Sequence, residues 1–345
     1  MAQKRHRVFV TGGAGFIGSA FIWLLSREWP QCEIINFDAL TYAGNPDNLA
    51  GLTHENYSFV RGDIADYEAV TAALGRNAEA IINFAAESHV DRSIANSAEF
   101  LRTNIIGTQI LLDAARANGV KRFVHVSTDE VMGSLPEDET SYFTEESPFA
   151  PNSPYAASKA AAEHLVRASH HTFGLDIVIT RCGNNYGPRQ FPEKFLPLTI
   201  SNALNDESIP LYGDGRNVRD WIYVDDHCRA ILLALEKGRS GAVYNIGARN
   251  ERRNIDVIQS VLDKLGKPHS LITFVKDRPG HDRRYAIDPL LIETELGWRP
   301  LETWETGLQK TISWYQDNIK WLERARSGAY RDYYRTQYGT EVGVV

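Results

Sequence analysis

The chain has few cysteines, no excess of positive charge and no long apolar run. Its 345 residues include three cysteines, Cys32, Cys182 and Cys228, without metal-ligand spacing, so we expect reduced thiols and no metal site. The formal net charge of -7 gives a nucleic-acid partner no electrostatic support. No apolar run approaches the ~20 residues that span a bilayer, and the basic residues 1–7 lack the apolar core and cleavage site of a signal peptide. We therefore expect a cytoplasmic protein with neither a nucleic-acid nor a membrane partner.

What the chain does contain is typical of a soluble enzyme, with 43% hydrophobic and 23% charged residues. Through the first half, strand-like runs alternate with helix-like runs. The strand-like runs are 7–11, 33–38, 57–61, 80–84 and 122–127, and the helix-like runs are 19–28, 67–74 and 104–118. This rhythm predicts an α/β fold, a Rossmann-type doubly wound parallel sheet with helices on both faces.

The second half of the chain departs from this rhythm. A helix rich in alanine is predicted over 155–171 and a strand over 176–181, after which prolines and glycines punctuate loops and short elements. We predict that residues 1–183 form the sheet domain, joined by a returning segment at about 220–248. Residues 184–345 are expected to form mainly a smaller α/β lobe.

A glycine-rich turn, Gly12, Gly15 and Gly18, stands where the first strand gives way to a helix. Glycine permits a tight turn and a close approach of the backbone to a pyrophosphate, which sits at the helix N-terminus. Asp38 closes the second strand 20 residues after Gly18, where a carboxylate binds ribose hydroxyls and repels a 2′-phosphate. The pattern predicts a dinucleotide site that prefers NAD to NADP, with residues 63–64 beside the adenine. The alternative is a structural turn in which Asp38 only caps its strand.

Tyr155 and Lys159 are four residues apart on a predicted helix and therefore share one face. Pro154 just before them suits a helix start. A lysine ammonium near a phenol is expected to lower the phenol pKa from ~10 toward the working range. Tyr155 could then act as the base for a substrate hydroxyl while hydride leaves for a nicotinamide. Without its context, such a pair is common on surface helices.

Three polar residues, Thr128, Asp129 and Glu130, follow the apolar strand 122–127 at its carboxyl end. Ligands of open α/β sheets bind at that edge. Adjacent carboxyl groups can have split pKa values, one protonated and one ionised, and elimination of water needs such an acid and base. The plainer reading, a polar turn, stays open on this pattern alone.

Several longer motifs carry a family resemblance over residues 6–315. They are NFDALTYAGN (36–45), NFAAESHVDRS (83–93), STDEV (127–131), SPYAASK (153–159), NNYGP (184–188), YGDG (212–215), NVRDW (217–221) and DRPGHDRRY (277–285). With them the chain resembles the extended short-chain dehydrogenase/reductase family, in its nucleotide-sugar branch, and within that branch the 4,6-dehydratases. Related epimerases share the glycine turn and the Tyr/Lys pair but generally lack the Asp-Glu pair.

The resemblance implies an NAD-dependent conversion of dTDP-glucose to its 4-keto-6-deoxy derivative. Tyr155 would take the C4 hydroxyl proton as hydride passes from C4 to NAD, and Thr128 would bond the C4 oxygen. Glu130 would remove the C5 proton while Asp129 protonates the departing C6 hydroxyl, after which the hydride returns to C6. The alternatives are the same chemistry on UDP-glucose or another nucleotide-linked hexose and, less expected, an epimerase. A non-catalytic dinucleotide sensor would be expected to lose the Tyr/Lys pair, and this chain retains Lys159 and its partner.

The resemblance also implies two sets of ligand contacts and a homodimer. The NAD set is Gly12, Gly15, Phe16, Ile17, Gly18, Asp38, Ala39, Leu40, Thr41, Asp63, Ile64, Ala85, Ala86, Ser88, Thr103, Tyr155, Lys159 and Asn185. The nucleotide-sugar set is Ser88, Thr128, Asn184, Lys194, Phe195, Pro210, Tyr212, Arg219, Asn254, Arg278 and His281. The helices at 104–118 and 155–171 are the candidates for a four-helix bundle between two subunits.

Two positions depart from the family pattern. Met132 stands where the family usually carries a tyrosine, and Gly183 where it often carries serine. Because Met132 follows the Asp-Glu pair, we expect that it could alter the setting of Glu130 or the sugar pocket. We also favour Ser88 over His89 as the substrate contact, since a satisfied structural histidine is the commoner outcome.

Overall fold

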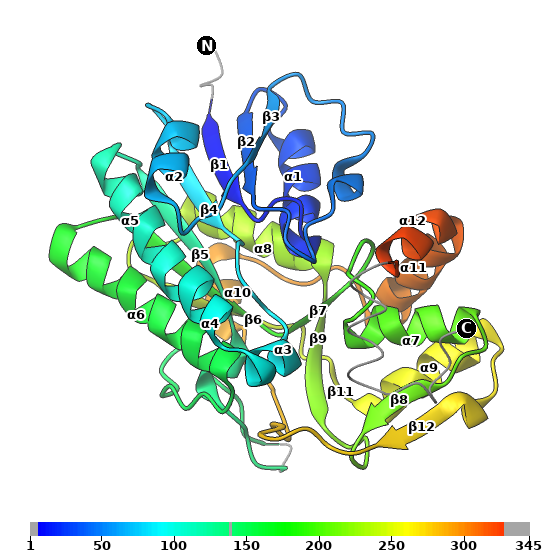
Figure 1. Ribbon diagram of the computed structural model, residues 1–345. Coiled ribbons are helices and arrows are strands. Elements are labelled where there is room, and N and C mark those ends of the chain that lie inside the picture. Colours follow the sequence, from blue (N-terminus) through cyan, green and yellow to red (C-terminus); the bar gives the residue numbers. More distant parts are fainter. Residues whose placement is uncertain (1–5, 138–139, 328–345) are drawn as a thin grey trace.

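The computed structural model describes residues 6–137 and 140–327 (Figure 1). Buried runs of β-branched and aromatic residues form the strands of its largest sheet. Seven strands lie in the order β10-β6-β5-β4-β1-β2-β3, and every pair is parallel. Their bounds are β1 Arg7–Thr11, β2 Glu33–Asp38, β3 Tyr57–Arg61, β4 Ala80–Asn83, β5 Arg122–Thr128, β6 Ile177–Cys182 and β10 Val243–Ile246. The predicted doubly wound sheet is confirmed.

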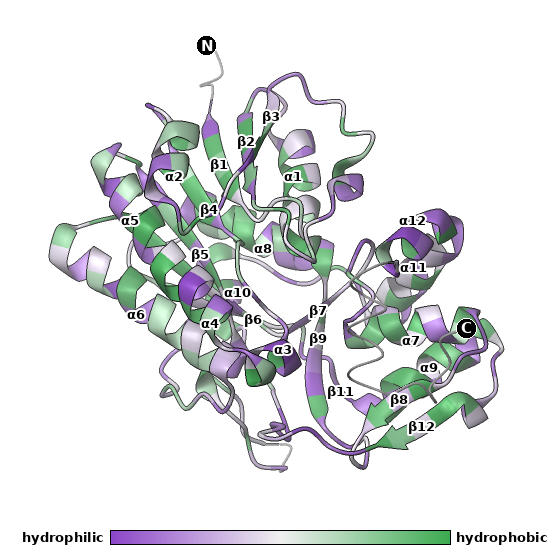
Figure 2. Ribbon diagram, viewed as in Figure 1, coloured by the Kyte–Doolittle hydropathy of each residue, from purple (hydrophilic) through white to green (hydrophobic). Residues whose placement is uncertain are grey.

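Helices cover both faces of this sheet. On one face α1 (Phe16–Glu28), α8 (Val224–Lys237) and α10 (Leu290–Leu296) share one hydrophobic cluster with the strands. On the other face α2 (Tyr67–Leu74), α5 (Thr108–Ala117) and α6 (Pro154–Phe173) share a second cluster. The central strands and the helix faces turned toward them carry most of the hydrophobic residues (Figure 2). The core is therefore a three-layer arrangement.

Local sequence signals explain where the helices begin and end. The Asp66 side chain accepts a hydrogen bond from the Ala69 amide and caps α2. Ser153 caps α6 in the same way, Pro154 occupies its first turn, and Gly174 ends it in the left-handed conformation at φ 69°. These signals fix the helix that carries the Tyr/Lys pair.

The helix predicted over 104–118 is longer and less regular than expected. It starts as α4 (Ala98–Phe100), passes through the π-helical segment η2 (Leu101–Gly107) and continues as α5. The Asn104 side chain connects this segment to its neighbours. Its oxygen accepts a hydrogen bond from the Glu87 amide, and its nitrogen donates to the Glu87 carbonyl and to the Ser158 hydroxyl. A π-helical turn of this kind often accompanies a functional site.

The smaller lobe follows β6. A three-stranded sheet combines β7 (Asn184–Tyr186), β9 (Val218–Tyr223) and β11 (Glu251–Arg253), and β8 (Ile209–Tyr212) pairs with β12 (Ile272–Val275). The remaining helices are α7 Phe195–Leu204, α9 Asn254–Leu265, α11 Trp304–Asp317 and α12 Ile319–Ala325. Short elements are α3 Val90–Ala95, η1 Pro46–Leu49, η3 Asp129–Met132 and η4 His269–Leu271. Aromatic side chains dominate this lobe's own core.

The carboxyl ends of the sheet strands face the smaller lobe (Figure 1). Strand β1 lies between β4 and β2, so the chain winds outward in both directions from this point. The crevice outside such a reversal is where open α/β sheets bind their ligands. Among the described residues, no helix is long and apolar enough to cross a membrane, and no group of three or more His, Cys, Asp or Glu side chains could hold a metal ion.

Candidate active site

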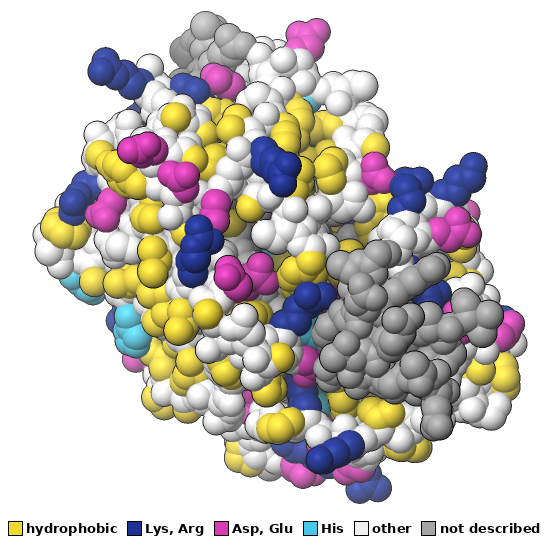
Figure 3. All heavy atoms as spheres, viewed as in Figure 1, with side chains coloured by type: hydrophobic (Ala, Val, Ile, Leu, Met, Phe, Trp, Pro, Cys, Tyr) yellow, Lys and Arg dark blue, Asp and Glu magenta, His cyan; other side chains and the backbone are white. Residues whose placement is uncertain are grey.

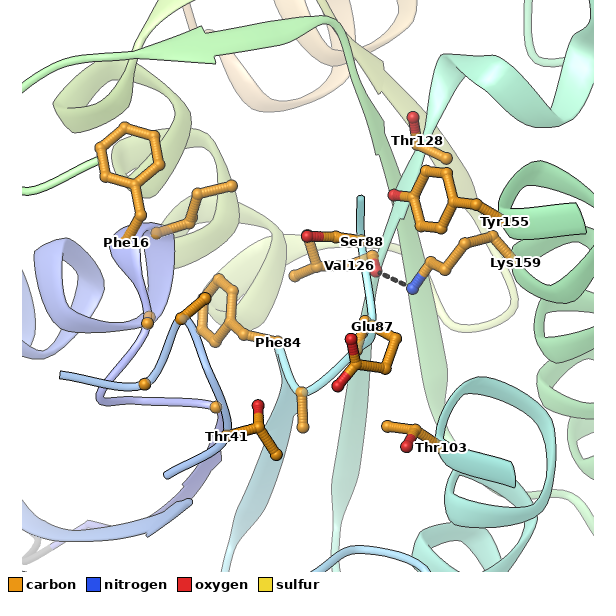
Figure 4. Close-up of a pocket in the computed structure, with 18 of the residues that line it drawn as sticks. Phe16, Thr41, Phe84, Glu87, Ser88, Thr103, Val126, Thr128, Tyr155 and Lys159 are labelled. Atoms are coloured by element: carbon orange, nitrogen blue, oxygen red, sulfur yellow. Dashed lines mark hydrogen bonds between the residues drawn. The ribbon is translucent and has the colours of Figure 1, made fainter. Parts of the chain in front are cut away.

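A cavity of about 360 Å³ opens at the carboxyl edge of the sheet (Figure 4). Phe16 and Phe84 border one side, and Tyr155 and Lys159 project into it from α6 on the opposite side. The cavity is lined by 17 of the 18 residues predicted to contact NAD, Gly12, Gly15, Phe16, Ile17, Gly18, Asp38, Ala39, Thr41, Asp63, Ile64, Ala85, Ala86, Ser88, Thr103, Tyr155, Lys159 and Asn185. Leu40 is the one predicted NAD contact that does not line the cavity. Its backbone amide donates a hydrogen bond to the Asp38 carboxylate.

The glycine turn lets two backbone segments meet at the floor of this cavity. Gly12 has φ 69°, and a Cβ there would lie 2.6 Å from the Ala85 nitrogen. A side chain at Gly12 would therefore collide with the residue that follows β4. The α1 amides beyond the turn have no side-chain cap, so they remain available to an anion at the helix N-terminus.

Asp38 lies at the end of β2, as predicted for a ribose-binding carboxylate. Its Oδ2 accepts from the Ala14 amide at 2.9 Å and its Oδ1 from the Leu40 amide at 2.7 Å. Burial raises the pKa of this carboxyl despite those two hydrogen bonds. Asp38 thus holds the backbone of the glycine turn and of the segment that follows β2.

Lys159 is 4% exposed and its Nζ donates to the Val126 carbonyl at 2.8 Å (Figure 4). Burial lowers its pKa to about 8. The pKa of Tyr155 is raised well above its ordinary value, by burial first and by the charge of Glu130 second. The expected lowering of the phenol pKa by the lysine is therefore not found: burial and nearby acidic groups raise the pKa, and the group that lowers it is the Thr128 side chain.

Asp129 and Glu130 occupy the η3 turn after β5, and their environments differ. Asp129 is 2% exposed, and burial together with the charge of Glu130 raises its pKa well above the ordinary value. The pKa of Glu130 is also raised by burial, but the positive charges of Arg278 and Arg219 oppose the rise. The charge of Glu130 thus disfavours the ionised form of Asp129, whereas Arg278 and Arg219 favour the ionised form of Glu130. The sequence motif suggested such a difference between the two carboxyl groups.

A second cavity, of about 180 Å³, adjoins the first on the side of the smaller lobe. The two share six lining residues, Ser88, Glu130, Asn184, Asn185, Gln190 and Lys194. The second is lined by ten of the eleven predicted nucleotide-sugar contacts, Ser88, Asn184, Lys194, Phe195, Pro210, Tyr212, Arg219, Asn254, Arg278 and His281, and the eleventh, Thr128, lines the first. Glu130 therefore stands where the two cavities meet.

The basic side chains of the second cavity are held by backbone groups and carboxylates. Arg219 is 4% exposed, lies 4.2 Å from the centre of the Tyr285 ring and donates to the Asp282 carbonyl. Arg278 faces Asp91 at 3.6 Å, and the Lys194 Nζ donates to the Ser88 carbonyl at 2.8 Å. These three cations provide the local positive charge that a diphosphate needs in an acidic protein.

The structure shows what surrounds Met132 and Gly183, the two residues that depart from the family pattern. Met132 is 3% exposed, packs with Val131, Phe143 and Tyr285, and receives the Arg181 guanidinium at its sulfur. It lines neither cavity, so the expectation that it alters the sugar pocket finds no support there. At Gly183 a Cβ would lie 2.7 Å from the Asp220 carbonyl oxygen.

Sequence reasoning missed several lining residues. Glu87 lies inside the NFAAESHVDRS motif, Glu193 precedes the predicted contact Lys194, and Gln190 and Phe191 come shortly after the NNYGP motif. Their position beside these motifs and contacts is the signal by which the sequence could have indicated them. His89, which the sequence left open, lines the second cavity beside Ser88, and burial holds its pKa well below the ordinary value.

Relatives with this arrangement are known. A family model described as GDP-mannose 4,6 dehydratase matches residues 9–311. A dTDP-glucose 4,6-dehydratase of Xanthomonas campestris pv. campestris (strain B100) is 51% identical over 342 residues, covering 93% of this chain and 96% of the relative. The chain belongs to the nucleotide-sugar 4,6-dehydratase family. The dTDP-glucose 4,6-dehydratase 1 of Escherichia coli (strain K12) is 46% identical and covers 96% of this chain and 99% of its own.

Solved structures of this family and of its neighbours share the fold. The dTDP-glucose 4,6-dehydratase DesIV of Streptomyces venezuelae, solved with NAD bound, has a TM-score of 0.90 and 51% identity, covering 92% of this chain and 99% of its own. The UDP-glucose 4-epimerase of Thermus thermophilus, in complex with NAD, has a TM-score of 0.83 and 32% identity over 90% of this chain and 99% of its own. The fold is thus common to dehydratases and epimerases, and the site chemistry must separate them.

Proposed function

We propose that this protein catalyses the NAD-dependent dehydration of dTDP-glucose to dTDP-4-keto-6-deoxy-glucose, and is thus a hydro-lyase. The observation that carries the proposal is the meeting of the two cavities at Glu130, beside Asp129 and Tyr155. An epimerase has no use for a protonated carboxyl beside an ionisable one, since no water leaves. The names of the relatives at 46–51% identity support the same substrate.

The residues divide the work as follows. NAD, when bound, supplies the hydride acceptor for C4 and the hydride donor for C6. Tyr155 takes the proton of the C4 hydroxyl, assisted by the Lys159 charge, and Thr128 bonds the C4 oxygen. Glu130 removes the C5 proton that the 4-keto group acidifies, while Asp129 protonates the leaving C6 hydroxyl. Burial raises the pKa of Asp129, which favours the protonated form that this role requires.

The ligand contacts follow the two cavities. The glycine turn would hold the pyrophosphate of NAD, Asp38 would bind its ribose, and Lys159 and Asn185 would contact its nicotinamide end. The diphosphate of the sugar nucleotide lies among Lys194, Arg219 and Arg278. We place the NAD-binding domain at residues 1–183, with about 220–248 returning to it, and the nucleotide-sugar lobe at 184–345, of which 1–5, 138–139 and 328–345 lie outside the described residues. Strand β10 supports the return because it pairs with β6, and α10 packs on the same sheet as a second returning segment.

A direct test compares nucleotides. Purified protein incubated with dTDP-glucose is expected to release one water per sugar, detected by mass spectrometry, without net accumulation of NADH. UDP-glucose is expected to react more slowly, because thymine and uracil differ by one methyl, which is worth ~1–3 kcal/mol. Absence of water loss from either substrate, in protein shown to contain NAD, would contradict the proposal.

We further propose that the protein is cytoplasmic and homodimeric. Cys32, Cys182 and Cys228 are buried and unpaired, which suits a reducing compartment. Hydrophobic side chains gather over α4 and the neighbouring helices (Figure 3). Leu101 is 46% and Ile106 54% exposed, on the helix that runs from α4 through η2 into α5. A four-helix bundle made with α6 and a second copy would cover them.

The dimer is testable with charge substitutions. The double variant Leu101→Glu/Ile106→Glu is expected to sediment as a monomer, because burying two carboxylates in an apolar interface is costly. The wild-type protein is expected to sediment as a dimer. Leu301→Glu is the control, since Leu301 is 73% exposed in a different part of the fold and should leave the dimer intact. A monomeric wild type, or a dimeric double variant, in sedimentation velocity would contradict this interface.

A further inference from the structure

We propose that three side chains from distant parts of the chain, Tyr42, Arg92 and Glu193, retain NAD in its cavity between turnovers. We call them the retention cluster. They touch neither the Tyr/Lys pair nor the Asp-Glu pair in any contact described above, and they act by holding backbone in place. The inference rests on the NAD site proposed above.

Arg92, on α3, is the centre of the retention cluster. Its Nε and Nη2 donate to Glu193 Oε2 at 3.2 and 3.0 Å. Its guanidinium carbon lies 4.0 Å from the centre of the Tyr42 ring. The Glu193 side chain is fully buried and that of Arg92 is 27% exposed. A buried carboxylate depends on such a partner, and the stacked ring adds a cation–π contact.

Tyr42 connects this cluster to the wall of the NAD cavity. It belongs to the segment 39–44 after β2, in which Ala39, Thr41, Ala43 and Gly44 line the larger cavity. Tyr42 is not among the lining residues and instead packs against Arg92 and, edge-on, Phe191. One side of the segment therefore lines the NAD cavity, and on the other side Tyr42 packs against Arg92 and Phe191.

The other end of the cluster lies on the substrate side. Glu193 precedes Lys194, whose Nζ bonds the Ser88 carbonyl and which lines both cavities. Arg92 follows Ser88 within the same motif. The retention cluster therefore connects residues 39–44, which line the NAD cavity, to the wall of the nucleotide-sugar cavity.

The chain just beyond this segment is anchored to the smaller lobe as well. The Arg324 side chain on α12 pairs with Asp47 at 2.7 Å. The Trp321 indole, also on α12, donates to the Asn48 side chain at 3.1 Å. Without the retention cluster, residues 39–44 would still be held by Asp38 at one end and by the Asn45 amide, which donates to the Ala14 carbonyl, at the other, but the side chain between them would lose its anchor.

Arg92→Gln tests the inference. The variant is expected to release NAD about tenfold faster from the purified holoenzyme, a change equivalent to ~1.4 kcal/mol. Release is followed with a coupled dehydrogenase that reduces each NAD+ as it leaves. At saturating NAD the kcat should stay within about twofold of wild type, because the reacting groups are untouched. Tyr42→Leu should release NAD faster than Tyr42→Phe, because phenylalanine keeps the ring against Arg92 and loses only the hydroxyl that bonds Glu193.

The chain offers a matched control in Arg252. Its guanidinium lies 5.1 Å from the Trp304 ring centre and 3.4 Å from Glu305, and it is 31% exposed. Arg252→Gln removes a similar arginine–aromatic–carboxylate group away from NAD and should leave NAD release unchanged. Unchanged release in Arg92→Gln, or equal acceleration in Arg252→Gln, would overturn the inference.

Two further measurements keep the outcomes separate. A fall of kcat at saturating NAD in Arg92→Gln would place the cluster in the chemistry and also overturn the inference. If Arg92→Gln does not fold by circular dichroism, the Tyr42→Leu and Tyr42→Phe pair decides, and equal release rates for the two would overturn it. Failure of the proposed function itself is recognised in the wild-type holoenzyme, which would then not dehydrate dTDP-glucose.

Discussion

Replacing Tyr155 with phenylalanine is expected to lower kcat for dTDP-glucose by about 10²–10⁴-fold, the usual contribution of a positioned proton-transfer group. The substitution removes only the hydroxyl oxygen to which we assign the transfer of the C4 proton. The ring is 8% exposed and keeps its packing against Phe100, so the fold and the NAD content should be unchanged. The measurement is steady-state kcat, with NAD content determined after denaturation of the protein.

Tyr244→Phe is the matched control for this experiment. Tyr244 is also buried, and its hydroxyl donates to Glu295 on α10 and accepts from the Arg239 amide. Losing that hydroxyl should cost some stability but little activity. A Tyr155→Phe enzyme that retains activity within a few-fold of wild type would contradict the role given to Tyr155.

Substituting the two carboxyl residues is expected to stop the reaction at different points. Glu130→Gln removes the base for the C5 proton, while the C4 oxidation needs only Tyr155 and bound NAD. In a single turnover, reduced nicotinamide should therefore accumulate on the enzyme, and turnover should fall by about 10²–10⁴-fold. In D2O no deuterium should enter C5 of recovered substrate. Absorbance at the NADH maximum and mass spectrometry report the two effects.

Asp129→Asn supplies the contrasting outcome. This variant keeps the Glu130 base but lacks the acid for the departing C6 hydroxyl, so elimination is slow. Deuterium should then enter C5 from D2O, because the proton can leave and return while the hydroxyl stays. Deuterium exchange in Glu130→Gln, with none in Asp129→Asn, would reverse the assigned roles of acid and base.

The βαβ rhythm and the strand predicted over 176–181 account for six of the seven strands of the sheet, whereas β10 was expected only as part of a returning segment and α8 and α10 were not predicted. β1, β2, β3 and α2 have the predicted bounds because their patterns end at clear caps and turns, such as Asp66. The π-helical segment at Leu101–Gly107 was beyond this reasoning. It depends on Asn104 contacts with Glu87 and Ser158, which no local pattern records.

Short motifs located the site because each of them ends a strand or opens a helix at the same edge of the sheet. Their electrostatics depended on burial, which the sequence does not state. The Tyr155 pKa moves upward instead of downward for this reason. Likewise, the contacts of Tyr42 with Arg92 and Glu193 join residues that are far apart in the chain. Such clusters can be recognised only once the lobes are placed together.

The measurement that tests the account most directly follows a labelled hydrogen. dTDP-glucose carrying deuterium at C4 is incubated with the wild-type holoenzyme, and the product is analysed by NMR and mass spectrometry. If one site oxidises C4, eliminates water and returns the same hydride, the deuterium appears at C6 of the 4-keto-6-deoxy product and no external NAD is consumed. A product without deuterium at C6, or deuterium returned to C4 of a 4-epimer, would contradict the dehydratase mechanism.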